Sequence, residues 1–115
     1  MPLDSRREGG ILILEAQGEL DGKTAPAFQE QVLALLEPKA PLLLSFARVS
    51  FLSSAGLRSL LLIHREARAR DTRVIFVQIP TEIRGSMAAT GFLAFFTVHD
   101  SVSEGLAAAI SDVAG

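Results

Sequence analysis

Short apolar runs alternate with longer amphipathic stretches along this chain of 115 residues. Three of the runs have the length and the apolar character of buried strands: ILILEAQG from residue 11, PLLLSF from residue 41 and RVIFVQI from residue 73. Between and after them, apolar residues recur at three- and four-residue steps, which is the spacing of one helix face. Strands alternating with helices predict an α/β domain with an at least partly parallel sheet.

Capping residues mark where the first two helices are expected to begin. Thr24 is a candidate N-cap, Pro26 suits a first helical turn, and Pro38 ends the first helix. The second helix follows two adjacent serines, Ser53 and Ser54, and continues for about fourteen residues. Its predicted inner stripe consists of Leu57, Leu60, Leu61, His64 and Ala67.

The last third of the chain predicts two more helices and one strand. A short helix opens at Pro80, with Gly91 at its C′ position, and the strand AFFTV follows from residue 94. Ser101 and Glu104 have the spacing of a capping box for the last helix. The predicted inner stripe of that helix is Val102, Leu106, Ala109, Ile110 and Val113.

Length and composition fit one domain over residues 1–115, with a core of roughly residues 8–113. We expect a mixed sheet of four to five strands with about four helices. The chain is 49% hydrophobic and 21% charged, which is enough apolar material for a core. It has no cysteine, so disulfides, thiolate zinc sites and cysteine nucleophiles are excluded.

Charge is unevenly distributed. Five arginines lie between Arg58 and Arg73 against two acidic residues, a local charge of +3, while the remaining six basic and eleven acidic side chains sum to −5. The total of −2 gives no general attraction to nucleic acid. The start of the chain lacks a signal-peptide h-region, and the longest apolar runs, PLLL and LLLI, are far too short to span a bilayer. We therefore expect a cytoplasmic protein without membrane insertion.

Few residues suggest catalysis. His64 and His99 are the only histidines, and His64 is about 15 Å of helical rise beyond Ser54. Glu19 and Asp21 are a conceivable carboxylate pair of the kind that glycosidases use. However, the chain has no tryptophan or tyrosine on which a sugar could stack. No spacing resembles a metal site or a phosphate-binding loop. The expectation is a protein that is not an enzyme and that has no metal or cofactor.

The stretch SSAGL places two hydroxyls where the second helix begins. Unpaired N–H groups and the positive end of the helix dipole lie there. A serine oxygen at this position can cap the helix, or it can accept a phosphoryl group that the N–H groups then stabilise. Small Ala55 and Gly56 leave room for another protein to reach the backbone. The sequence leaves both interpretations open.

The outer face of the second helix suggests a binding surface. At about 100° per residue, Arg58, Leu62, Arg65, Glu66 and Ala69 point away from the core stripe. Leu62 is then an exposed leucine surrounded by charge. An exposed leucine among arginines, on the helix that a modifiable serine begins, fits an anchor for a protein partner.

Three segments together resemble the STAS domain, and within it the bacterial anti-sigma factor antagonists. They are GELDGKTAPAFQEQV from residue 18, VSFLSSAGLRSLL from residue 49 and IPTEIRGSMAATGF from residue 79. In that family a G-E-L-D loop precedes the first helix, D-S-S-G-L or D-S-T-G-L starts the second, and a P-x-[VI]-x-R…TGL segment forms the third. The resemblance covers roughly residues 8–113.

The resemblance implies a partner switch in which Ser54 is the phosphorylated residue. Ser54 matches the first hydroxyl of the motif, Ser53 stands where the family usually has aspartate, and Ala55 takes the second hydroxyl position. Asp21 matches the loop aspartate of the family. Three roles are open for it: contact with the partner, support of the serine loop, or only the formation of a turn. The implied partners are a GHKL-type serine kinase that is also an anti-sigma factor, and a PP2C-type phosphatase. The predicted partner-binding residues are Asp21, Ser53, Ala55, Gly56, Arg58, Leu62 and Arg65.

Three alternatives accompany this hypothesis. The chain can be a STAS accessory subunit of an ABC-type lipid transporter, which docks on an ATPase and need not be phosphorylated. It can be a partner-switch antagonist that controls secretion. From a different class, it can be a small hydrolase that uses Ser54 with His64 or His99 brought in by folding.

Overall fold

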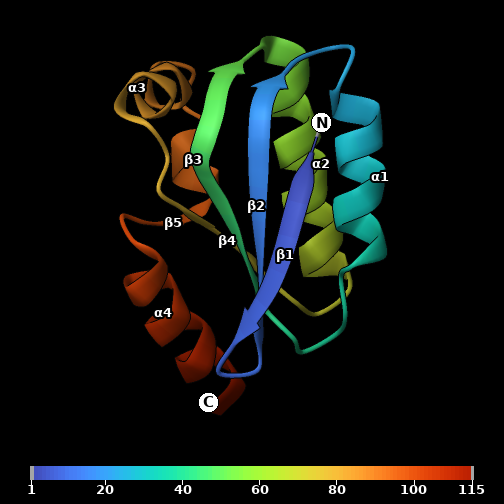
Figure 1. Cartoon of the computed structure of the whole chain (residues 1–115), viewed down its shortest axis with the longest axis vertical. Helices are drawn as coiled ribbons and strands as arrows, with labels where there is room; N and C mark the ends of the chain where they lie inside the picture. Colours follow the sequence, from blue (N-terminus) through green and yellow to red (C-terminus); the bar gives the residue numbers. More distant parts are fainter. Residues whose placement is uncertain (1, 115) are drawn as a thin grey trace.

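A mixed five-stranded sheet lies at the centre of the computed structural model, which describes residues 2–114 (Figure 1). The strands are β1 (Leu3–Glu8), β2 (Ile11–Leu20), β3 (Leu42–Leu52), β4 (Val74–Val77) and β5 (Thr97–His99), and they lie in the sheet in that order. β1 is antiparallel to β2, and the other three pairs are parallel. The helices of this region are α1 (Ala25–Ala34), α2 (Ser54–Ala69), α3 (Thr81–Ala89) and α4 (Val102–Ala114), with a 3₁₀ turn η1 (Leu93–Phe95). The predicted mixed α/β architecture is confirmed.

The strand order decides which face each helix covers. Each parallel strand is added beside the previous one in the same direction, and right-handed crossovers then place successive helices on one face. α1 and α2 accordingly lie side by side behind the sheet in Figure 1. They bury the larger core, in which Phe28 of α1, Leu60 of α2 and Phe46 of β3 are fully enclosed.

α4 covers part of the opposite face. Its contact is close because Gly105 has no side chain; a Cβ there would lie 2.6 Å from Cγ1 of Val77. Ala109 is buried as predicted, but Ile110 and Val113 are 49% and 59% exposed. The prediction of these two as inner residues is wrong, because α4 runs past the sheet beside the β1–β2 turn, where Ile110 meets Gly9 (Figure 1).

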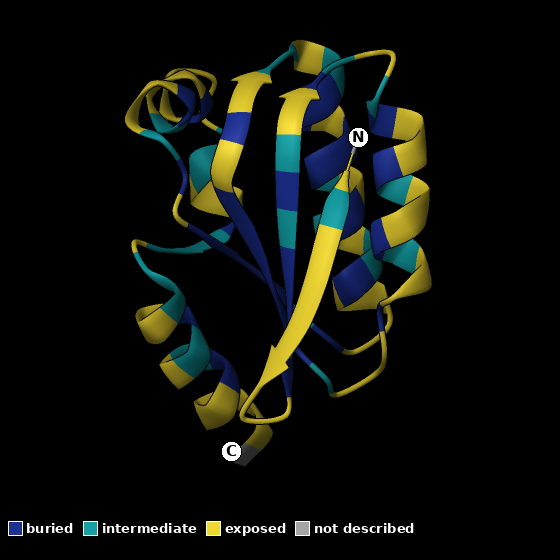
Figure 2. Ribbon diagram, in the orientation of Figure 1, coloured by how far each residue is buried: buried dark blue, intermediate teal, exposed yellow. Residues whose placement is uncertain are grey.

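Two segments differ from the sequence-based expectation. β1 was not predicted, because it is an edge strand that carries almost no buried side chain (Figure 2). It extends the fold to the N-terminal side of the expected core. In AFFTV, the strand begins only at Thr97, and Leu93–Phe95 form η1. Phe96 packs edge-on against the Phe76 ring at 4.7 Å, so this part of the segment serves the core.

Other local signals are confirmed. The Ser101 hydroxyl accepts a hydrogen bond from the Glu104 N–H at 3.1 Å, as expected for a helix start. Gly91 follows α3 with φ +79°, the left-handed conformation of a C′ glycine. Within residues 2–114, no helix combines the length and the apolar character that crossing a bilayer requires.

Gly56 and Gly85 form a matched pair for testing how α2 is held. A Cβ at Gly56 would lie 2.4 Å from the Leu20 carbonyl oxygen, whereas a Cβ at Gly85 in α3 meets nothing within 4 Å. We expect Gly56→Ala to lower the free energy of unfolding by more than about 2 kcal/mol. Gly85→Ala should raise it by about 0.5–1 kcal/mol through helix propensity. Urea unfolding measures both, and an equal gain in the two variants would contradict the close packing of α2 on β2.

Candidate functional site

The start of α2 is fixed against the carboxyl end of β2. The Ser53 N–H donates to the Leu20 carbonyl at 3.0 Å. Gly56 is buried one turn into the helix, and its missing side chain lets the Leu20 carbonyl approach. From the sequence, Gly56 was expected to give a partner access to the backbone, but the structural reason for a glycine lies inside the protein. A partner contact at Gly56 stays a prediction that concerns its backbone only.

Ser53, and not Ser54, caps α2. Ser53 has extended backbone angles (φ −87°, ψ 174°), and its hydroxyl accepts a hydrogen bond from the Gly56 N–H at 3.2 Å. Its carbonyl accepts the first helical bond from the Leu57 N–H at 2.9 Å. Aspartate and serine are both favoured N-caps, so Ser53 can take over this duty where the family usually has aspartate.

Ser54 is the first residue of α2, and it is exposed. In the described part of the chain, no acceptor is assigned to the N–H groups of Ser54 and Ala55, as is usual for a first helical turn. The positive end of the helix dipole lies at the same place. Arg58 is exposed one turn further on, four residues from Ser54 and therefore on the same helix face. The serine that has no capping duty thus lies among donors suited to an anion.

Asp21 organises the neighbouring loop. Its Oδ1 accepts hydrogen bonds from the N–H groups of Lys23 at 2.9 Å and Thr24 at 3.1 Å. These bonds, with that of Thr24 the stronger influence, hold the pKa of the Asp21 carboxyl below its usual value. Thr24 is the N-cap by position, but its hydroxyl donates to the Glu19 carbonyl at 2.8 Å instead of capping α1. Asp21 is therefore a turn-forming residue, and its contact with a partner stays a prediction.

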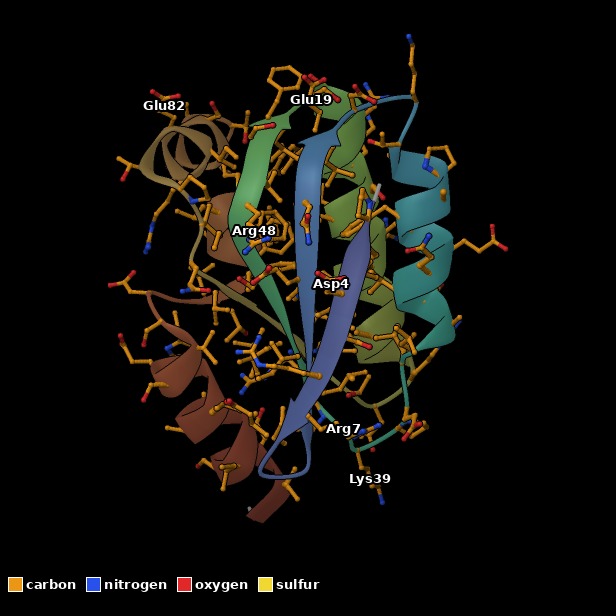
Figure 3. All side chains as sticks on the ribbon, in the orientation of Figure 1. Asp4, Arg7, Glu19, Lys39, Arg48 and Glu82 are labelled. Carbon is orange, nitrogen blue, oxygen red and sulfur yellow. The ribbon has the colours of Figure 1, made fainter. Side chains whose placement is uncertain are left out.

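The two loops lie together at one end of the sheet. A Cβ built on Gly22 would be 3.8 Å from the Ala55 Cβ, so the Asp21 loop borders the start of α2. Glu19 projects at the same end (Figure 3). On the other side of Ser54, Ser86 of α3 and its C-cap residue Thr90 line a depression of about 110 Å³. No sequence pattern predicted that α3 would lie beside Ser54.

The outer face of α2 is exposed as predicted. Arg58 and Arg65 are exposed, and the Leu62 side chain is 38% exposed between them. Phe51, just before Ser53, is 50% exposed and was missed because its strand was expected to end earlier. Alternation along β3 would have placed Phe51 on the same side as the buried Val49, but the pairing with β2 shifts register between these two residues. We call Phe51, Ser54, Arg58, Leu62 and Arg65 the α2 surface.

Neither histidine lies near Ser54. His99, at the end of β5, is level in the sheet with Ser45 of β3, nine residues before Ser54. His64 is half-buried and packs edge-on against the Phe96 ring at 5.6 Å. Burial, followed by the charge of Arg68, lowers the pKa of His64. Ile63 takes the fully buried position of the helix, leaving His64 and Leu61 at the edge of the stripe. Because His64 is about 15 Å along the helix from Ser54, it cannot serve as the base of that hydroxyl.

Carboxylates and histidines of residues 2–114 form no cluster of three or more that could hold a metal ion. Glu19 and Asp21 lie at the end of β2 and in the following loop, and Asp21 uses its carboxylate for the turn. The start of α2 thus offers N–H donors for an anion, and the α2 surface beside it combines apolar and cationic side chains.

Comparison with known proteins identifies the family of this chain. The STAS domain profile matches residues 3–105. The chain belongs to the STAS domain family. A relative named an anti-sigma factor antagonist, BtrV of Bordetella bronchiseptica, is 28% identical over 102 residues, covering 88% of each chain.

Solved structures show the same STAS fold in different settings. The anti-sigma factor antagonist SpoIIAA of Bacillus, solved in unphosphorylated and phosphorylated forms, is 17% identical in the first form, with a TM-score of 0.70 and coverage of 91% and 93%. A sulfate transporter family protein from Wolinella succinogenes is 23% identical, with a TM-score of 0.80 and coverage of 94% and 91%. Shared fold alone therefore does not decide the role of this STAS domain.

The two serines should separate in a stability measurement. Ser53→Ala removes the cap and should lower the free energy of unfolding by about 0.5–2 kcal/mol, whereas Ser53→Asp should retain most of it. Ser54→Ala should change it by less than about 0.5 kcal/mol. Thermal or urea unfolding gives the comparison. A larger loss for Ser54→Ala than for Ser53→Ala would show that Ser54, and not Ser53, caps the helix.

Proposed function

We propose that this STAS domain is an anti-sigma factor antagonist that works by partner switching. Unphosphorylated, it binds a GHKL-type serine kinase that is also an anti-sigma factor, and phosphorylation of Ser54 ends that binding. A PP2C-type phosphatase restores the free hydroxyl. The observation that carries the proposal is the exposed Ser54 hydroxyl at the first position of α2, with the cap supplied by Ser53. The named relative BtrV and the two forms of SpoIIAA support it.

The position of Ser54 suits a phosphate physically. A phosphoserine adds about −1.5 to −2 charge at pH 7 and three acceptor oxygens. The nearest donors in sequence are the N–H groups of Ser54 and Ala55 and the guanidinium of Arg58, and the helix dipole adds a positive field. The protein keeps its fold because the anion occupies a site that favours it.

The same phosphate opposes binding of a partner that covers the start of α2. Burying a dianion in an interface has a large desolvation cost unless a cation of the partner meets it. The rest of the α2 surface stays unchanged, so the switch acts through charge and bulk at one edge of the interface. These residues are Phe51, Arg58, Leu62 and Arg65. In this role the domain is a phosphoacceptor and a binding module, and not a catalyst.

Phosphorylation should map to Ser54. Incubation with the cognate kinase and ATP, followed by peptide mass spectrometry, should find phosphate on Ser54 and none on Ser53. Ser54→Ala should abolish incorporation, while Ser53→Asp, which keeps an N-cap, should remain a substrate. Phosphate found only on Ser53 would refute the site.

The kinase experiment also separates the proposed function from its alternatives. A STAS subunit docked on a transporter ATPase requires no phosphate, so failure of a proven cognate kinase to modify the chain would remove the switch. Turnover of generic esters that Ser54→Ala abolishes would instead establish a hydrolase.

Leu62 should anchor the kinase. Leu62→Glu should weaken binding by at least about tenfold, the loss expected for an interface anchor, while the melting temperature changes little because the side chain is exposed. Leu35→Glu is the matched control, since Leu35, the C-cap residue of α1, is 39% exposed and lies outside the α2 surface. Titration calorimetry gives both dissociation constants, and equal values for the two variants would remove Leu62 from the interface.

A further inference from the structure

A second surface feature lies at the opposite end of the sheet from Ser54. The cavity there has a volume of about 390 Å³, within the range typical of small-molecule sites. Its lining includes Leu12 at the start of β2 and Leu42 at the start of β3. The start of α2 lies at the other ends of these strands, roughly 30 Å away. The cavity is therefore separate from the α2 surface.

Exposed apolar side chains converge on this cavity. Within residues 2–114, six large hydrophobic residues are exposed, and three of them, Leu35, Ile110 and Val113, line it. These three come from the end of α1 and from the last turns of α4, which are distant in sequence. Such a concentration of exposed apolar surface indicates a binding site more than chance exposure does.

Two rigid turns form the walls. Gly9 and Gly10 have φ values of +58° and +81° in the β1–β2 turn, and the Arg7 guanidinium donates to the Gly10 carbonyl at 3.3 Å. In the second wall, Lys39 has φ +62°, which is uncommon for a residue with a side chain. Its N–H donates to the Asp71 carbonyl at 2.8 Å, and this bond holds the turn in place. The cavity is therefore preformed.

The rim of the cavity is cationic. Arg7 and Lys39 line it together with a single acidic residue, Glu37, and Figure 3 shows the two basic side chains at the same end of the sheet. Among the ion pairs of residues 2–114, none includes these three residues. Lys39 also borders a second, more polar depression, which Arg68 and Arg73 line together with Asp71 and Asp112. Arg73 is paired with Asp112 there. The surface thus changes from apolar to polar across Lys39, and the charges at the rim of the first cavity are those of Arg7, Lys39 and Glu37.

We propose that this cavity binds a single-chain amphiphile with an anionic head group, such as a medium-chain fatty acid or an alkyl phosphate. The alkyl chain packs against Leu35, Ile110 and Val113. The head group lies at the rim, where Arg7 and Lys39 supply the positive charge. This site is independent of the phosphorylation of Ser54.

Ten-carbon ligands that differ only in the head group test the site. Decanoate, decyl phosphate, decanol and decyltrimethylammonium are each titrated as monomers, and amide shifts give the dissociation constants. Both anions should bind about fivefold or more tighter than decanol, consistent with two exposed charge contacts, and the cation should bind weakest. Shifts should concentrate in residues 7–12, 35–42 and 110–113. A cation that binds as tightly as decanoate would overturn the proposal, as would shifts located elsewhere.

Variants assign the two halves of the site. Ile110→Glu should weaken decanoate, decyl phosphate and decanol by more than about tenfold, because it places a negative charge in the apolar part. K39Q removes one rim charge and keeps the backbone bond that holds its turn, so it should weaken both anions and leave decanol unchanged. Phe95→Ser, at a residue 60% exposed outside the cavity, is the control and should bind normally. Normal binding by Ile110→Glu would refute the site.

Sedimentation and thermal melts complete the test. Ile110→Glu should melt close to the parent, since the side chain is 49% exposed. The parent should be a monomer at the concentrations used. A dimer that Ile110→Glu dissociates and decanoate leaves intact would show that a second copy covers the cavity, and would overturn the proposal.

Discussion

The close contact between Gly56 and the Leu20 carbonyl fixes the candidate site. With a distance of only 2.4 Å to a Cβ built at residue 56, any other amino acid would push α2 away from β2. The contact brings the Ser53 N–H to the same carbonyl and sets the first turn of α2 at the end of the sheet. The site is therefore held by packing inside the molecule, so an event at the surface need not move it.

Adjacent serines divide two tasks at this fixed position. Ser53 turns inward to close the first helical turn, and Ser54 faces solvent with unpaired N–H donors around it. If one residue did both, modification would remove the cap and weaken the helix. With the tasks separated, charge can be added without loss of structure. Arg58, Leu62 and Arg65 continue the surface along the helix and give a partner both apolar and cationic contacts.

Sequence patterns predicted the alternating α/β order, the buried strands and the exposed face of α2, because each depends on periodicity. β1 escaped prediction because an edge strand with exposed side chains has no apolar alternation. Ile110 and Val113 were misplaced because helical period cannot tell where the sheet ends. The sequence could not decide which of Ser53 and Ser54 is the N-cap, because both are serines and only the backbone angles distinguish the N-cap from the next residue. Ser86 and Thr90 became neighbours of the site only through folding.

The central claim is that phosphate on Ser54 acts at a rigid helix start without remodelling the fold. Amide spectra and thermal melts of the phosphorylated and unphosphorylated forms test it most directly. We predict shift changes confined to residues 20–24, 53–58 and the adjacent part of α3, with stability equal or raised by about 0.3–1 kcal/mol. Shift changes across β3 and β4, or a clear fall in melting temperature on phosphorylation, would contradict the account.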